Sequence, residues 1–217
     1  MTTGTSTRIV DLKRLREIGP DAVLLLRLMR AANDIALANW GLRHFKEEQP
    51  PARRHSQLGK QRYFVRLQCG HLSEALSLAA EVQRSSRLHG FLLSRCSQDA
   101  KDAFLRILEF VRGGCRRQEF ERYIVSVRDK ITFHYDPAPT RAALDHRADH
   151  DATRYSKVTD GTDIDRWRFD IADDLEDSIV CRQLWGIPMH ADLRTEADRI
   201  ADFGSDRCID YLTFSCI

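Results

Sequence analysis

Apolar residues recur every three or four positions over two long stretches of this chain, residues 21–45 and 60–89. This interval matches the 3.6-residue turn of an α-helix and not the two-residue repeat of a strand. The repeating positions are Leu25, Leu28, Met29, Ala32, Ile35 and Ala36 in the first stretch, and Phe64, Leu67, His71, Ala75, Leu78 and Val82 in the second. Further apolar residues surround the first set, so we expect the first helix to be buried on most sides.

Shorter helices are expected around these two. Their ranges are 8–18, 98–112, 116–135, 140–152, 172–185 and 190–213. Antiparallel helices joined by short loops form a bundle, so the fold class is mainly α, an antiparallel helical bundle. The length suits a single domain, residues 1–217, with the bundle core at about 20–150 and a C-terminal extension at about 153–217.

A small β-hairpin is expected near residues 154–171. Apolar and polar residues alternate in residues 155–159 and 167–171, with Asp160 and Gly161 between the two segments. This alternation is typical of a strand, and the Asp-Gly pair favours a tight turn.

Composition favours a folded protein in the cytoplasm. Charged residues make up 30% of the chain and hydrophobic residues 42%, which suits a globule. The longest unbroken apolar run, residues 22–26, is far shorter than the roughly 20 residues of a membrane helix, so no membrane is expected. The six cysteines form no C-x-x-C pair, which favours reduced thiols.

Charge is distributed unevenly along the chain. Residues 1–70 carry 13 Lys and Arg against 6 Asp and Glu, whereas residues 136–217 carry 10 against 18. Either the basic part faces nucleic acid, or the basic and acidic parts pack together or pair across a dimer. A basic loop follows the first long helix, and its candidate RNA contacts are Arg53, Arg54, Lys60 and Arg62, with a solvated loop as the alternative.

The helix expected at 116–135 carries the residues with catalytic chemistry. Val127, Ile131 and His134 share one face by their spacing, and Arg128 borders that face. Cleavage of RNA without a metal needs a base for the 2′-hydroxyl, an acid for the leaving 5′-oxygen and a cation for the phosphate. Histidine titrates near neutral pH, and arginine matches phosphate oxygens with a planar fork. One Arg and one His are therefore a minimal set for this reaction.

This segment resembles the HEPN family (higher eukaryotes and prokaryotes nucleotide-binding domain), whose members carry an Arg, a polar residue and then a His after four to six intervening residues. The matching positions are Arg128, Asp129 and His134, followed by Tyr135. The resemblance implies a helical bundle and a metal-independent endoribonuclease without cofactors, acting as a toxin or in defence against phage. It also implies a homodimer with the motif at its interface, RNA as substrate, and an antitoxin or regulatory protein as partner.

In this interpretation Arg128 stabilises phosphate charge and His134 is the general base or acid. Asp129 and Tyr135 support them, Asp129 by orienting one of the two and Tyr135 by contacting substrate. The structural alternative is that Arg128 pairs with Asp129, Glu121 or the acidic tail, and that His134 caps a helix end. The functional alternative is a non-catalytic HEPN-like interaction or regulatory protein.

Two other groups of polar residues have both a functional and a simpler structural interpretation. Asn33 and Asp34 interrupt the apolar centre of the first long helix, where they either line a polar cleft near Arg128 or form a buried hydrogen-bond network. His146 and His150 have the spacing of a zinc pair, but a solvated helix face is favoured and no metal site is expected. A phosphate-binding glycine loop and a G-x-S-x-G motif are both absent from the sequence.

Overall fold

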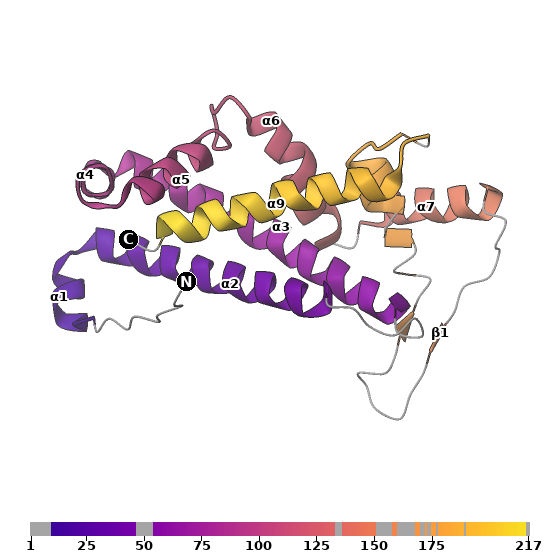
Figure 1. The fold of residues 1–217 in the computed structure, drawn as a ribbon, viewed down its shortest axis with the longest axis horizontal. Helices are drawn as coiled ribbons and strands as arrows, with labels where there is room; N and C mark the ends of the chain where they lie inside the picture. Colours follow the sequence, from indigo (N-terminus) through magenta and orange to yellow (C-terminus); the bar gives the residue numbers. More distant parts are fainter. Residues whose placement is uncertain are drawn as a thin grey trace.

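The fold is an antiparallel bundle of helices, which confirms the expected mainly-α class. The computed structural model describes residues 10–46, 54–132, 136–150, 158–159, 168–169, 172, 175–176, 178–188 and 190–215. Figure 1 shows the long helices α2, α3 and α9 side by side, with α7 projecting at one end of the bundle. Within the described part of the chain, no helix combines the length and apolar character needed to cross a membrane.

Helices α2 (Pro20–Lys46) and α3 (Arg54–Arg84) form the largest helix pair. They run antiparallel, because Arg27 contacts Glu81 near one end and Asn39 contacts Gln68 near the other. The short helix α1 (Leu12–Glu17) precedes them, and Asp11 caps it by accepting a hydrogen bond from the Lys13 backbone N–H.

The second apolar stretch is divided between two helices. Helix α3 ends at Arg84, and α4 (Ser86–Arg95) begins directly afterwards. Ser85 makes this division, because its hydroxyl accepts a hydrogen bond from the Leu88 N–H and so caps α4. The prediction of a single helix over residues 60–89 was therefore wrong about where that helix ends. The helical character of both parts is confirmed.

Helix α5 (Gln98–Leu108) is capped in the same way by Ser97 and ends four residues before the expected position. A helical segment follows, made of α6 (Arg117–Phe120) and the π-helical turns η2 (Glu121–Val125) and η3 (Arg128–Thr132). Its buried side chains are Phe120, Ile124, Val127 and Ile131, which include the two apolar residues expected to share one face, Val127 and Ile131.

The remaining elements are α7 (Pro137–His150), strands β1 (Val158–Thr159) and β2 (Arg168–Phe169), the π-helix η5 (Ser178–Leu184) and α9 (Leu193–Ser215). The two strands pair antiparallel with Val158 opposite Phe169, inside the range expected for the hairpin. Helix α9 continues through Gly204 without a break.

The apolar core extends beyond residue 150, because α9 packs against α2, α3 and α5. Tyr211 and Phe214 of α9 are fully buried, and Phe214 contacts Phe104 of α5 with ring centroids 5.2 Å apart. An ion pair of 2.7 Å between Arg106 of α5 and the buried Asp210 of α9 also joins these antiparallel helices.

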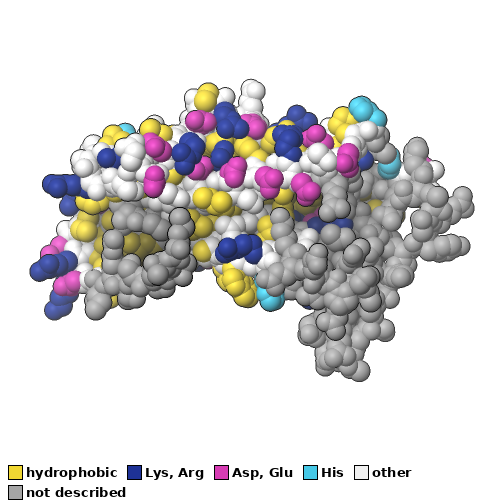
Figure 2. All heavy atoms as spheres, in the orientation of Figure 1, with side chains coloured by type: hydrophobic (Ala, Val, Ile, Leu, Met, Phe, Trp, Pro, Cys, Tyr) yellow, Lys and Arg dark blue, Asp and Glu magenta, His cyan; other side chains and the backbone are white. Residues whose placement is uncertain are grey.

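The basic and acidic parts of the chain contact each other at some positions, but part of the acidic charge stays exposed. A contact of 3.2 Å between Arg66 and Glu176 joins the basic part, residues 1–70, to the acidic part, residues 136–217. The ion pair between Arg106 and Asp210 joins the middle of the chain to the acidic part. The outer side of α9 still carries exposed acidic residues, and Figure 2 shows a row of acidic side chains along this part of the molecule. Packing of the basic part against the acidic part therefore accounts for some of the charge separation.

The outward face of α2 departs from expectation. We expected α2 to be buried on most sides, but its side away from α3 is open to solvent. The exposed apolar residues on this helix are Val23, Leu26, Met29, Leu37 and Trp40. One face of α2 packs on α3 and α9, and the bundle does not cover the opposite face. Asn33 is exposed there, so the expectation that it lies in a buried network was wrong.

Candidate functional site

Arg128 begins the π-helical turn η3, which packs against the middle of α3. The burial of Val127 and Ile131 on either side of Arg128 holds this turn on the bundle. The Arg128 side chain then lies along the surface with about a third of its area exposed, 34%. The apolar residues expected to anchor the segment therefore place its arginine at the rim of the core and not inside it.

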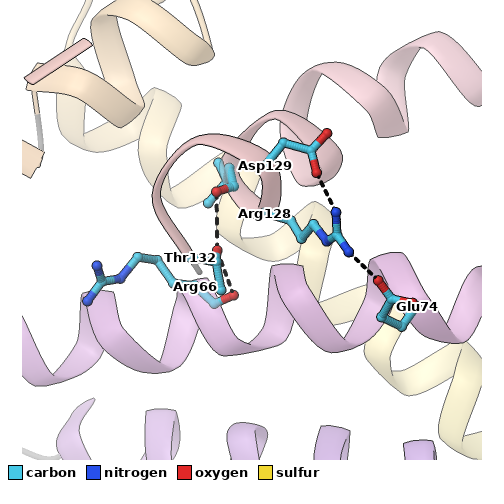
Figure 3. A network of polar contacts seen from close by, with 6 residues as sticks. Arg66, Glu74, Arg128, Asp129 and Thr132 are labelled. Atoms are coloured by element: carbon cyan, nitrogen blue, oxygen red, sulfur yellow. Dashed lines mark hydrogen bonds and ion pairs between the residues drawn. The ribbon is translucent and has the colours of Figure 1, made fainter. Parts of the chain in front are cut away.

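Two carboxylates hold the Arg128 guanidinium (Figure 3). Nη1 donates to Asp129 Oδ1 at 2.7 Å, and Nη2 donates to Glu74 Oε1 of α3 at 2.6 Å. These bonds, the one to Asp129 first, raise the pKa of Arg128 above its ordinary value, although partial burial acts in the opposite direction. The guanidinium therefore stays charged and has a fixed orientation.

The third nitrogen of Arg128 has a different environment. Nε is buried and makes no hydrogen bond with any described residue. A buried donor without a partner costs free energy, so this atom adds nothing to the stability of the observed arrangement. The hydrogen bonds that Arg128 makes with described residues are therefore those of its two terminal nitrogens to the carboxylates.

Thr132 fixes the other end of η3 to α3. Its hydroxyl oxygen lies 3.3 Å from the Arg66 carbonyl oxygen and 3.2 Å from the Val127 carbonyl oxygen, and its single hydrogen is shared between these two acceptors. The turn η3 therefore follows α3 from Glu74 towards Arg66 (Figure 3). Arg66 Nε lies 3.2 Å from Glu176 Oε1, but this contact lacks the alignment of a hydrogen bond. The turn η3 thus contacts α3 both at Glu74, which pairs with Arg128, and at the half-buried Arg66.

Lys130 of η3 and Asp136, four residues after the end of η3, form an ion pair of 2.9 Å. The hydrogen bond from Lys130, together with one from the Ala138 backbone N–H, lowers the pKa of Asp136. This pair connects the two ends of the segment that contains His134. His134 and Tyr135 themselves lie outside the described residues, as does Arg53.

The other candidate RNA contacts lie near the start of α3. Arg54 begins this helix, Lys60 is exposed and Arg62 is half-buried. Along an α-helix, Lys60 is about 20 Å from Glu74, so these cations are not part of the Arg128 cluster. A single-stranded chain that touched both would have to follow α3 over about four turns.

The structure brings Arg128 together with Asp129, as the sequence suggested, and adds Glu74. Glu74 is 54 residues from Arg128, and no local pattern marks it as a partner. The structural alternative named Asp129, Glu121 and the acidic tail. Of these, Asp129 pairs with Arg128, whereas Glu121 pairs with Arg117 at 2.8 Å.

Asn33 and Asp34 do not join this site. Asn33 is exposed on α2, and Asp34 lies 4.0 Å from His71. A hydrogen bond from the buried Gln68 of α3 to Asn39 of α2 lies within the α2–α3 pair instead. No group of three or more His, Cys, Asp or Glu side chains suited to a metal ion occurs among the residues whose placement is described.

The charge balance of the cluster decides what it can bind. One guanidinium faces two carboxylates, so an approaching phosphate meets net negative charge until one carboxylate moves away. Glu74 is 65% exposed and can leave with little loss, because exposed ion pairs contribute about 0–1 kcal/mol. The arrangement is therefore an oriented cation with a displaceable partner.

Comparisons with protein-family models, with curated proteins and with solved structures found no match to this chain.

Proposed function

We propose that this chain is a metal-independent endoribonuclease of the HEPN type, in which Arg128 and His134 act on one phosphodiester. The observation that supports this proposal best is the orientation of Arg128. Its guanidinium is charged, part exposed and fixed six residues before His134, and its own chain supplies both carboxylates that hold it. Such preorganised positive charge is often the largest single term in catalysis of charge-forming reactions.

The proposed reaction is an internal transesterification. His134 takes the proton of the 2′-hydroxyl, the 2′-oxygen attacks phosphorus, and the bond to the 5′-oxygen breaks. The leaving oxygen takes up one proton, either the one that His134 received or one from a water molecule that the imidazolium then resupplies, and becomes a 5′-hydroxyl. The other product ends in a 2′,3′-cyclic phosphate. Arg128 offers two N–H groups to the phosphate oxygens once Glu74 has moved aside. Asp129 keeps the guanidinium oriented during this exchange, and Tyr135 contacts the substrate.

Alanine substitutions test the proposal. Arg128→Ala and His134→Ala are expected to abolish RNA cleavage in the presence of EDTA while leaving far-ultraviolet circular dichroism unchanged. Arg95→Ala is the matched control, because Arg95 is an exposed arginine at the end of another helix, α4. Cleavage retained by both site variants would refute the assignment.

The arrangement of the site is tested separately by mixing the two inactive variants. If one chain contributes both the Arg128 guanidinium and the His134 imidazole to each site, the mixture stays inactive. In the composite dimer cleft implied by the family resemblance, Arg128 of one chain works with the imidazole of another. Restored activity in the mixture would then favour the composite cleft.

The second candidate function is a non-catalytic interaction protein. The ion pairs of Arg128 favour it, because a guanidinium already held by Glu74 and Asp129 is a common structural contact. Under this alternative the purified protein leaves RNA intact, and its expression does not slow growth. A growth comparison between wild type and His134→Ala separates the two candidates.

A further inference from the structure

The exposed face of α2 follows the spacing of a coiled-coil seam. Starting at residue 23, the outward positions are separated by three, four, three, four and three residues, as are the a and d positions of heptads. The residues at these positions are Val23, Leu26, Arg30, Asn33, Leu37 and Trp40, and we call them the α2 seam. All six are exposed, whereas Leu28 and Ile35, on the opposite face, are buried in the bundle.

The α2 seam has the same pattern when read from either end: two apolar positions, two polar positions and two apolar positions. If two α2 helices lie antiparallel about the midpoint between Ala31 and Ala32, three kinds of contact result. Val23 faces Trp40, Leu26 faces Leu37, and Arg30 faces Asn33. A two-fold interface requires this reciprocity, because residue i must contact j while j contacts i.

The polar centre fits the same arrangement. The side chains of Arg30 and Asn33 make no hydrogen bond or ion pair with another described residue of their own chain. Across an antiparallel pair, the Arg30 guanidinium meets the Asn33 amide oxygen and the neighbouring Asp34 carboxylate of the other copy, and it can donate to both. A polar layer of this kind specifies the register of a helix pair.

We propose that a second copy of this chain binds the α2 seam in antiparallel orientation. Trp40 and Leu37 are 57% and 63% exposed, and together with Val23 and Leu26 they bury roughly 1,000 Å² in total when two copies meet. This area lies at the lower limit for a specific interface, so the pair is of modest affinity. Trp40 is the expected anchor, and its ring already stacks on His44 at 5.3 Å.

This pair differs from the composite cleft implied by the family resemblance. The α2 seam faces away from α3, and η3 lies against α3 without extensive contact with α2. Two copies joined through α2 therefore keep their Arg128 sites apart. The proposal does not depend on RNA cleavage, and its tests need no RNA.

Sedimentation equilibrium over a range of protein concentrations tests the association. The wild type is expected to dimerise, and Leu26→Glu combined with Leu37→Glu is expected to weaken dimerisation at least tenfold. Leu105→Glu combined with Ile209→Glu is the matched control, because both residues are similarly exposed but lie on α5 and α9. A wild type that stays monomeric up to about 100 μM would overturn the proposal, as would equal loss of dimer in the control.

Cysteine crosslinking tests the orientation in a Cys115→Ser background, which removes an exposed thiol. In the antiparallel pair, the two Asn33 positions are offset by about 5 Å along the helix axis and the two Val23 positions by about 25 Å. Asn33→Cys is therefore expected to give a crosslinked dimer with a short bismaleimide, and Val23→Cys is not. Crosslinking of both variants indicates that the two helices are parallel. A lack of crosslinking in Asn33→Cys indicates that no α2 pair forms. Either result overturns the proposal, and the background protein is the control.

Discussion

Replacing Glu74 by Gln is expected to strengthen RNA binding. In the proposed function, a phosphate needs the N–H group of Arg128 Nη2. In the observed structure Glu74 accepts a hydrogen bond from this nitrogen at 2.6 Å. The substitution keeps the size of the side chain and removes its charge. The phosphate then competes with a neutral amide and no longer with a carboxylate.

The magnitude follows from the exposure of the pair. Glu74 is 65% exposed, so water screens its charge, and its repulsion of a phosphate about 5 Å away is about 0.8 kcal/mol. Loss of the competing surface ion pair adds about 0.5 kcal/mol. The dissociation constant for RNA is therefore expected to fall about three- to tenfold, with the smaller change at higher salt.

Fluorescence anisotropy with a short single-stranded RNA measures this change, in a His134→Ala background that prevents cleavage. Glu81→Gln is the control, because Glu81 is another carboxylate of α3 that pairs with an arginine, Arg27, at 2.6 Å. The reasoning is refuted if Glu74→Gln leaves the dissociation constant unchanged or if Glu81→Gln lowers it equally.

Two further predictions concern stability. Asp210→Ala is expected to lower the free energy of unfolding by about 3 kcal/mol in urea denaturation, because it leaves the 11% exposed Arg207 without its buried partner; a loss below about 1 kcal/mol would contradict this. Burial raises the pKa of Cys69 to about 12 and also raises the pKa values of Cys208 and Tyr211. The folded protein keeps these protons where the unfolded chain releases them, so stability is complete below about pH 8.5 and falls as pH rises towards the folded pKa values. Urea midpoints between about pH 8 and pH 10.5 measure this, and a midpoint independent of pH in that range would count against the burial argument.

The helices of the core were predictable because apolar periodicity is a local property. Val127 and Ile131 share one helical face by their spacing, and both are buried, together with Phe120 and Ile124 of the same segment. Helix ends were less predictable where a single hydrogen bond decides them. The Ser85 hydroxyl caps α4, and nothing in the apolar pattern of residues 60–89 distinguishes this serine from its neighbours.

The surroundings of the site were predictable only within its own segment. Asp129 follows Arg128 directly, and its contact was anticipated. Glu74 could not be identified, because its contact depends on how η3 packs on α3. The burial of α2 was overestimated for a similar reason: a helix that is apolar on all sides indicates buried faces but not which molecule covers them.

Cleavage of an RNA and its 2′-deoxy analogue in EDTA tests the central claim most directly. We predict that wild type cleaves only the RNA, leaving a 2′,3′-cyclic phosphate and a 5′-hydroxyl, and that Arg128→Ala and His134→Ala cleave neither strand. An intact RNA with the folded wild type, equal cleavage of both strands, or full activity in Arg128→Ala would contradict the account.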